Sequence, residues 1–461
     1  MVRANTLAAL AAFSSLSVHG FDLDVKSDDS IKSTASSIAS VLVGYYNGNE
    51  TGETPGLLPE PYYWWNAGAM WDTLIQYWQL TGDDQYNGIV SQALQFQSGS
   101  DDRGDFMPLN QTKTLGNDDQ ATWALAAMSA AEQDFPTPEN TTWFALADAV
   151  FNEQVVRWDT ASCGGGLRWQ IFTFNAGYNY KNSISNGDLF QLAARLARYT
   201  GNTTYFDWAA KVYDWTTSIG FIDDEYNVFD GADTTQNCSA VSKLQFSYVA
   251  GTYINGAAYM YNISSGDDQE TWKTELDGLL KKNLDVFFPD GIATEVSCEE
   301  RGTCNTDNLS MKGIFAQNLL DTIKVAPYTG DKILKVLSSS AGAAASACSS
   351  TGCSLAWNGT ETESGDGGVG PALSALSYVQ GLLVGKAAAP VTEATGGAGS
   401  NSSGTSSGGS GTSTNSTGSG SPTSSGTPAP TTTGNAAVAL GSTMGMGGVA
   451  AIMGSAAWLL L

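Results

Sequence analysis

The sequence predicts an all-α fold in which helical hairpins close into a toroid. From residue 21 to about residue 387 the chain is rich in alanine, leucine and aromatics and has no low-complexity break, which indicates one large domain. A glycine-containing turn recurs between apolar helix ends, and the intervening loops are long and rich in glycine and tryptophan. Hairpins at such irregular spacing favour a closed toroid, with its loops around one mouth, over an open solenoid.

Four segments carry the turn signature that predicts the helical hairpins. In each, an apolar helix end is followed by Thr-Gly or Ser-Gly, then by Asp or Asn at the start of a new helix. Glycine ends one helix and Asp or Asn caps the next, which is how antiparallel helices are joined. The segments are residues 77–90 (YWQLTGDDQYNGIV), 196–209 (LARYTGNTTYFDWA), 260–274 (MYNISSGDDQETWKT) and 325–337 (VAPYTGDKILKVL).

The first long aromatic segment, PYYWWNAGAMWDTLIQYWQL, combines a core stripe with candidate binding residues. Trp64 and Trp65 precede the predicted helix, and flat aromatic faces next to Asp, Asn and Gln suit sugar rings, so both are candidate substrate contacts. The alternative is that these aromatics only close an edge of the core. The helical part repeats apolar residues at i, i+3, i+4 and i+7, which predicts a core stripe of Trp71, Leu74, Ile75 and Trp78.

Three further residues are candidate substrate contacts. Trp169 lies in the second aromatic segment, CGGGLRWQIFTFNAGYNYKNSISNG. Asp72 lies inside the first predicted helix, and Asp230 lies in the segment VFDG. Each acid also has a structural interpretation, since Asp72 can be a solvated or paired helical residue and Asp230 can belong to a turn.

Charge and histidine content exclude several classes of function. The formal net charge of −25 argues against nucleic acid or an anionic membrane surface as partner, because both require a basic surface. The single histidine, His19, lies in the predicted signal peptide, so the mature chain contains none. This removes Ser-His-Asp and Cys-His catalysis, histidine bases and ordinary zinc sites. An enzyme of this composition must use carboxylates, tyrosines, lysines or oxygen-ligated calcium.

Both ends of the chain predict export to the cell surface. A basic start, the apolar run LAALAAF and the small residues SSLSVHG predict a signal peptide over residues 1–20. Residues 388–435 form a stalk rich in Ser, Thr and Gly, typical of O-glycosylated segments. Residues 436–461 resemble a propeptide for a GPI anchor on Asn435, which would hold the protein on the outer leaflet; the alternative is a merely hydrophobic or tail-anchored end.

Glycosylation sequons and cysteines agree with a secreted protein. Six cysteines in a secreted chain are expected to form disulfides, and six allow fifteen pairings. Short spacing favours Cys298–Cys304 and Cys348–Cys353, which leaves Cys163–Cys238, while the other pairings remain open. Ten Asn-X-Ser/Thr sequons are present: Asn49, Asn110, Asn140, Asn202, Asn237, Asn262, Asn308, Asn358, Asn401 and Asn415.

Two adjacent aspartates, in the segment LGNDDQATWALAAMSAAE, are the candidate catalytic residues. Asn117 and Gln120 predict a capping box, with Asn117 as N-cap and Asp118 and Asp119 as the first two helical residues. Acids in a first turn are also favoured by the helix dipole without any function. The functional hypothesis is that the helix terminus lowers one carboxyl pKa while the neighbouring charge raises the other. Glycoside hydrolysis needs such a pair.

The segments GNDDQATWALAAMSAAE, PYYWWNAGAMWDTLIQYW, RWDTASCGGGLRWQIFTFNAGYNYKNSISNG, VFDGADTTQNCS and CEERGTCNTDNLSMKG closely resemble fungal members of glycoside hydrolase family 76. These are GPI-anchored endo-α-1,6-mannanase-like proteins of the cell wall. The resemblance covers nearly all of residues 21–387 and implies an (α/α)6 barrel with retaining cleavage of α-1,6-mannosidic linkages. It implies that Asp118 is the nucleophile and Asp119 the general acid/base, without a metal or organic cofactor.

The resemblance also implies the partners and an alternative function. Fungal members of this type are expected to act on the mannose core of GPI glycans and to transfer wall glycoproteins to β-glucan. The alternative is a non-catalytic wall protein that binds mannan on the same fold. The chain departs from the family pattern at Val249, Asn308 and Met311 and in the segment GVGPAL, which contains Ala372. We expect these departures to affect the choice of donor and acceptor.

Overall fold

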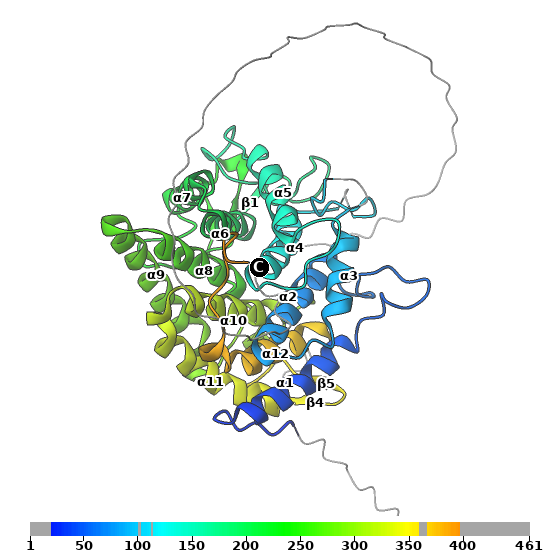
Figure 1. Cartoon of the computed structure of the whole chain (residues 1–461). Coiled ribbons are helices and arrows are strands. Elements are labelled where there is room, and N and C mark those ends of the chain that lie inside the picture. Colours follow the sequence, from blue (N-terminus) through cyan, green and yellow to red (C-terminus); the bar gives the residue numbers. More distant parts are fainter. Residues whose placement is uncertain (1–19, 100–102, 112–113, 359–366, 397–461) are drawn as a thin grey trace, which may run out of the picture. The chain divides into compact units, whose positions relative to one another are not determined.

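The computed structural model describes residues 20–99, 103–111, 114–358 and 367–396 (Figure 1). The chain divides into two compact units, Met1–Ser402 and Ser403–Leu461, and the second lies outside the described residues. Outside them also lie the predicted signal peptide up to residue 19, most of the predicted stalk, the predicted GPI segment, and Asn401, Asn415 and Asn435. These predictions are not tested by the structure.

Six of the twelve α-helices in the described part of the chain form a closed inner ring. Each inner helix packs against the next, and α12 returns to pack against α2. The ring is therefore closed, and the fold is the (α/α)6 barrel that the resemblance predicted. The inner helices are α2 (Trp64–Thr81), α4 (Asn117–Glu132), α6 (Ser183–Thr200), α8 (Ser247–Ile263), α10 (Asn308–Val325) and α12 (Val369–Gly381).

Glycines allow the inner helices to approach one another closely. A Cβ atom added to Gly313 of α10 would lie 2.6 Å from the Cα atom of Ser374 on α12. A Cβ atom on Gly256 of α8 would lie 2.3 Å from the ring of Phe190 on α6. All of α12 is buried, as is most of α6, although the buried residues of α6 include Asp188 and Arg195.

The outer helices are joined to the inner ones by turns that the sequence predicted in part. Gly82 and Gly201 adopt the left-handed conformation just after α2 and α6, as expected. Gly330 instead opens the next helix in a right-handed conformation, because Pro327 has already ended the preceding segment. The outer helices are α1 (Asp28–Val43), α3 (Asn87–Gln97), α5 (Trp143–Val156), α7 (Thr203–Ser218), α9 (Gly266–Phe287) and α11 (Gly330–Ser346).

Short strands and 3₁₀ helices lie in the connections. An antiparallel sheet orders β1 (Tyr180–Asn182), β2 (Gly231–Asp233) and β3 (Val241–Ser242), while β4 (Cys348–Ser349) pairs with β5 (Gly352–Cys353). The 3₁₀ helices are η1 (Thr234–Gln236), η2 (Pro289–Gly291), η3 (Glu299–Arg301), η4 (Pro327–Thr329) and η5 (Val384–Lys386). The three predicted disulfides are confirmed: Cys163–Cys238, Cys298–Cys304 and Cys348–Cys353.

The ends of the inner helices meet at a buried ionic network. Arg195 of α6 forms an ion pair with Glu132 of α4 at 2.7 Å, and Tyr259 of α8 donates a hydrogen bond to the same carboxylate at 2.9 Å. Lys324 of α10 forms an ion pair with Asp321 at 3.0 Å. The first two contacts join α4, α6 and α8 near their C-terminal ends, and the third lies within α10, so the network contributes to stability rather than to chemistry.

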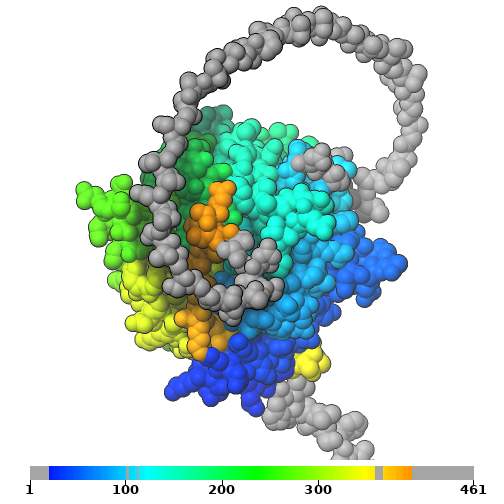
Figure 2. Space-filling view, viewed as in Figure 1, coloured from blue at the N-terminus to red at the C-terminus, as the bar shows by residue number. Residues whose placement is uncertain are grey.

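Residues 387–396, the C-terminal part of the described chain, cross this end of the barrel. The backbone N–H of Val391 donates to the carbonyl oxygen of Glu132 at 2.7 Å, and Arg198 donates to the carbonyl oxygen of Pro390 at 2.8 Å. The N–H of Glu393 donates to the carbonyl oxygen of Tyr199 at 2.9 Å. In Figure 2 the orange C-terminal segment lies on the visible face of the molecule.

Candidate active site

The N-terminal ends of the inner helices meet at the other end of the barrel. The indole N–H of Trp65, at the start of α2, donates to Asp307 just before α10 at 3.1 Å. The side-chain amide of Asn182, just before α6, donates to Asp118 in the first turn of α4 at 2.9 Å. Side chains distant in the sequence are therefore gathered around the two adjacent aspartates.

The helix that carries the two aspartates begins one residue earlier than the sequence predicted. Gly116 is the N-cap, so Asp118 and Asp119 are the second and third helical residues, and the predicted Asn117 cap is wrong. The side chain of Asn117 is engaged elsewhere: it donates to the carbonyl oxygen of Arg168 at 2.8 Å and accepts from Arg157 at 3.0 Å. Asp119 Oδ2 instead accepts the Gly116 N–H at 2.7 Å.

The two carboxyl groups converge on the face of Gly116. A Cβ atom on this residue would lie 2.3 Å from Asp118 Oδ1 and 3.1 Å from Asp119 Oδ2. These two oxygens cannot be farther apart than the sum of these distances, which is less than the roughly 6.5–9.5 Å that separates the carboxyl groups of inverting glycosidases. The absence of a side chain at residue 116 thus makes room for the pair.

Both aspartates are partly exposed, yet protein surrounds most of each carboxyl group. Burial raises the pKa of Asp118 to about 8, and the neighbouring charge of Asp119 adds to this rise. Burial raises the pKa of Asp119 to about 6, although the Gly116 N–H opposes it. The prediction that the helix terminus lowers one pKa is therefore wrong, because loss of hydration outweighs the helix terminus. Between these values the coupled pair shares one proton.

More carboxyl groups surround the pair. Burial, followed by the negative charge of Asp118, raises the pKa of Asp188 on α6 well above its ordinary value. Burial also raises the pKa of Tyr248 on α8, and the charges of Asp118, Asp230, Asp188 and Asp307 add to this rise. None of these acids forms an ion pair with a residue that the structure describes. The site therefore gathers acids without a compensating cation among the described residues, which favours neutral or cationic ligands.

Three of the predicted contact residues lie beside the pair. Trp65 is half-buried and bonded to Asp307, whose charge acts on Asp119. The carbonyl oxygen of Trp169 accepts the N–H of Asn117 at 2.8 Å, which fixes this half-buried aromatic next to the catalytic helix. Asp230 accepts a hydrogen bond from the Tyr180 hydroxyl at 2.6 Å.

The structure places the other two predicted contacts away from the pair. Trp64 is only 8% exposed, stacks on Trp123 at 4.9 Å between ring centroids and donates to Gln97 at 2.9 Å, so its ring packs in the core. Asp72 lies about 12 Å farther along α2 from the start of the helix. Its carboxyl belongs to the buried network of Arg195, where burial raises its pKa to about 6. Neither position supports a substrate contact.

Sequence reasoning missed Asn182, Asp188, Tyr248 and Asp307. Asp188 could have been found, because it is the single acidic residue of α6. Asn182 and Asp307 required long-range contacts, since each faces a helix distant in the sequence. Of the departures from the family pattern, Val249, Met311 and Ala372 are buried, and the amide of half-buried Asn308 contacts Met311 Sδ at 3.5 Å.

The remaining features of the described residues add no second site. They contain no group of three or more His, Cys, Asp or Glu side chains that could hold a metal ion, and none of their helices is long and apolar enough to span a bilayer. A cavity of about 380 Å³ between α7 and α9 contains none of the predicted contacts. Of the sequons in the described chain, Asn308 is half-buried, and seven are exposed: Asn49, Asn110, Asn140, Asn202, Asn237, Asn262 and Asn358.

Comparison with known proteins agrees with this geometry. The model of glycosyl hydrolase family 76 matches residues 30–394. The chain is 42% identical to the mannan endo-1,6-alpha-mannosidase DFG5 of Saccharomyces cerevisiae over 402 residues, which is 84% of this chain and 87% of that protein. It is 43% identical to the putative mannan endo-1,6-alpha-mannosidase C970.02 of Schizosaccharomyces pombe over 384 residues, 82% of this chain and 86% of that protein.

Solved structures are similar as well. Dfg5 from Chaetomium thermophilum, crystallised with glucosamine, superposes with a TM-score of 0.76 at 40% identity and covers 81% of this chain and 95% of its own. The α-1,6-mannanase GH76A of Salegentibacter, as an inactive variant with α-1,6-mannotriose, gives a TM-score of 0.61 at 19% identity, covering 77% of this chain and 99% of its own. The second similarity concerns the fold alone.

Proposed function

Because the chain belongs to glycosyl hydrolase family 76, we propose that it is a retaining endo-α-1,6-mannosidase with Asp118 as nucleophile and Asp119 as general acid/base. The observation that carries this proposal is the convergence of both carboxyl groups on the bare face of Gly116. Relatives that are more than 40% identical are named mannan endo-1,6-alpha-mannosidases, which supports the choice of bond.

The proposed reaction has two steps. In the first, Asp119 gives its proton to the glycosidic oxygen while the Asp118 carboxylate attacks the anomeric carbon, so that the sugar–oxygen bond breaks and a glycosyl ester forms. In the second, ionised Asp119 takes a proton from an acceptor hydroxyl, whose oxygen displaces Asp118. Each step needs one protonated and one ionised carboxyl group. Burial raises the pKa of Asp118 above that of Asp119 in the free protein, so the scheme requires that the shared proton moves to Asp119 when the substrate binds.

The physiological donor we propose is wall mannan or the mannose core of GPI glycans, with a β-glucan hydroxyl as acceptor in place of water. The enzyme would then link GPI-anchored proteins to the wall as a transglycosidase. An extracellular site of action agrees with three disulfides, which persist in oxidising compartments. GPI attachment at Asn435 remains part of the proposal.

Incubation with a defined α-1,6-mannoside or GPI core glycan and a β-glucan oligomer tests the function. We expect a product of retained α configuration, and transfer adds the mass of the acceptor. If water is the only acceptor, the proposed transferase activity is wrong. If the product has the inverted configuration, the proposed covalent intermediate is wrong. Mass spectrometry of a trapped reaction should find the sugar on the Asp118 peptide, and Asp118→Asn serves as control.

The same assay distinguishes a non-catalytic wall protein. Such a protein would bind mannan under acidic conditions without cleavage or transfer. Partial exposure of both aspartates, with one shared proton, favours the enzyme.

A further inference from the structure

Strand β1 contacts the catalytic pair on one face and carries a buried lysine, Lys181, on the other face. Side chains alternate along a strand, so Tyr180 and Asn182 point to one face and Lys181 to the other. On the first face Asn182 donates to Asp118 and Tyr180 donates to Asp230. The second face packs against residues 158–168 through Lys181. This strand therefore determines where two polar side chains meet the site.

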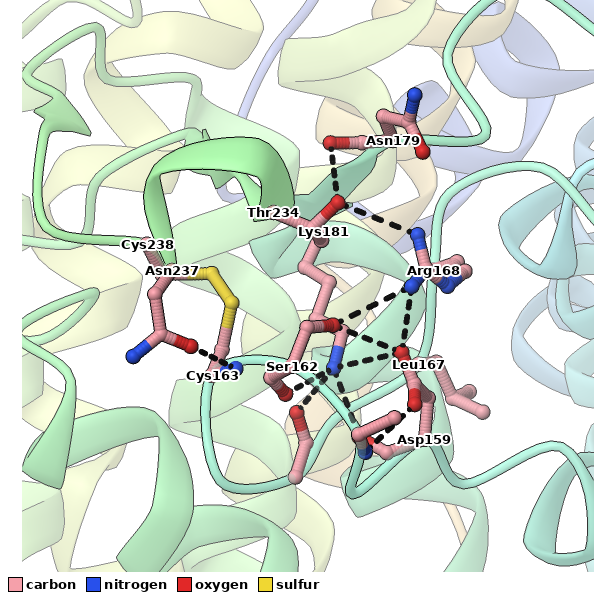
Figure 3. A network of polar contacts seen from close by, with 12 residues as sticks. Asp159, Ser162, Cys163, Leu167, Arg168, Asn179, Lys181, Thr234, Asn237 and Cys238 are labelled. Atoms are coloured by element: carbon pink, nitrogen blue, oxygen red, sulfur yellow. Dashed lines mark hydrogen bonds and ion pairs between the residues drawn. A yellow bond between two sulfur atoms is a disulfide. The ribbon is translucent and has the colours of Figure 1, made fainter.

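The ammonium group of Lys181 is held in a carbonyl cage, formed by the backbone oxygens of Asp159, Ser162 and Gly165 (Figure 3). The three distances from Nζ are 2.8, 2.8 and 2.5 Å. The Asp159 carboxylate lies 3.3 Å away, and the lysine side chain is fully buried. An ammonium has three N–H donors, so the cage satisfies all of them and fixes the strand from behind.

The loop that forms the cage is itself fixed. Arg168 forms an ion pair with Asp159 at 2.8 Å and donates to Thr234 Oγ1 at 3.2 Å, and both contacts are visible in Figure 3. The disulfide Cys163–Cys238 joins the same loop to the segment after β2. The loop, the lysine and the strand therefore form one rigid unit.

Asn182 uses both ends of its amide. Its Oδ1 atom accepts the N–H of Ser185 at 3.3 Å and caps α6, while its Nδ2 atom donates to Asp118 Oδ2 at 2.9 Å. The cap orients the amide, so the donor points at the carboxylate. A neutral donor stabilises the charged form of an acid over its protonated form. The charged or titratable groups around Asp118 are Asp119, Asp188 and Tyr248, and none of them is a cation.

We propose that Asn182 is a positioning residue that orients the Asp118 carboxyl group and stabilises its ionised form, and that the carbonyl cage of Lys181 holds Asn182 in place. The inference rests on the proposed function, because Asp118 must be ionised when it attacks. Asn182 adds a side-chain donor to Asp118, whose Oδ1 atom also accepts the N–H of Asp119 at 3.0 Å, whereas Asp119 accepts the N–H of Gly116.

Asn182→Ser tests the proposal, because serine is a good helix cap but too short to reach Asp118. We expect kcat to fall by about 10- to 100-fold, the loss of one charge-assisted hydrogen bond, with KM little changed. We also expect the pH profile of kcat/KM to move to higher pH. Lys181→Met should move the profile in the same direction. Ser27→Ala, which removes the cap of outer helix α1, should lower stability only.

A readout without substrate keeps this test separate from the proposed function. ¹³C NMR of carboxyl-labelled aspartate, with Asp118→Asn to assign the signal, follows the ionisation of Asp118 directly. In Asn182→Ser the Asp118 signal should titrate at higher pH than in the wild type. Identical titration in both proteins would overturn the inference, even if the enzyme cleaves mannosides. Absence of cleavage by the wild type would overturn the proposed function alone.

Discussion

The two ends of the barrel bury acidic groups in opposite ways. At the C-terminal ends of the inner helices, the acids lie among cations: Asp72, Glu132 and Asp321 lie near Arg195 and Lys324. At the N-terminal ends, five acids lack an ion pair with any described residue: Asp118, Asp119, Asp188, Asp230 and Asp307. The comparison separates acids that stabilise the fold from acids that are available for chemistry.

The difference has a physical cost and a chemical consequence. A buried carboxylate without a cation loses hydration that nothing restores, so its protonated form is favoured. This disfavours folding at high pH but leaves an acid that can donate a proton near neutrality. At the other end burial also raises the pKa of Glu132, but the Arg195 guanidinium opposes that rise.

The largest expected effect is a fall of kcat when one acid at the N-terminal end is replaced. The same replacement at the C-terminal end is the control. Asp119→Asn should lower kcat by about 10²–10⁴-fold, the usual contribution of a general acid, while sugar binding remains. Asp321→Asn, the matched change in the paired network, should leave kcat close to that of the wild type. Single-turnover kinetics measures the rate of cleavage of an α-1,6-mannotetraose, and calorimetry measures its binding. Wild-type turnover in Asp119→Asn would remove this residue from the mechanism.

The next effect is on stability and belongs to the paired end. Arg195→Met leaves Glu132 buried without its partner and should cost about 3–5 kcal/mol in the free energy of unfolding. Urea unfolding measures this loss. The double variant Arg195→Met/Glu132→Gln should recover part of it, because the orphaned charge is gone. If the single and double variants are equally unstable, the ion pair is not the reason for the burial of Arg195.

Much of the fold was predictable because its signals are local. The glycine turns at Gly82 and Gly201 and the core stripe through Trp71 are determined by residues within one or two helical turns. Trp64 shows the limit of this reasoning: whether an aromatic before a helix faces solvent or the core depends on Trp123, which lies on another helix. Closure of the ring was favoured by the irregular spacing of the hairpins and by their long loops, whereas the (α/α)6 architecture was implied by the family resemblance.

The candidate site was predictable at its centre and not at its periphery. Adjacent aspartates at a helix start were visible in the sequence, but their pKa values depend on burial, on Asn182 and on Asp307, and the last two residues precede other helices. The predicted N-cap was wrong by one residue, because the Asn117 side chain instead accepts a hydrogen bond from Arg157 and donates one to the carbonyl oxygen of Arg168. Contacts with residues distant in the sequence therefore determine both the pKa values of the aspartates and the start of the helix.

Gly116→Ala is expected to displace the carboxyl groups of Asp118 and Asp119 without changing their charge. The backbone of Gly116 tolerates alanine, since its φ is −82° and its ψ 164°, but the new methyl group would collide with both carboxyl groups. Displacement of reacting groups by about 1 Å costs about 10²-fold in rate, which we expect in kcat. Gly342→Ala is the control, because open space surrounds that position. Equal activity of both variants would contradict the packed geometry of the pair.

The last difference between the two ends is a pH-dependent change of stability. The pKa of Asp118 is raised in the folded protein to about 8, so its stabilising contribution is present below its ordinary pKa and is lost as the pH rises through about 8. Asp118→Asn removes the ionisable group, and its melting temperature should exceed that of the wild type increasingly over this range. Glu132→Gln provides the contrast, because Arg195 then loses its partner and the variant should be less stable at neutral pH. Thermal melts in a series of buffers measure both. A constant difference for Asp118→Asn across the range would show that the N-terminal end of the barrel does not hold Asp118 as an unpaired, desolvated acid.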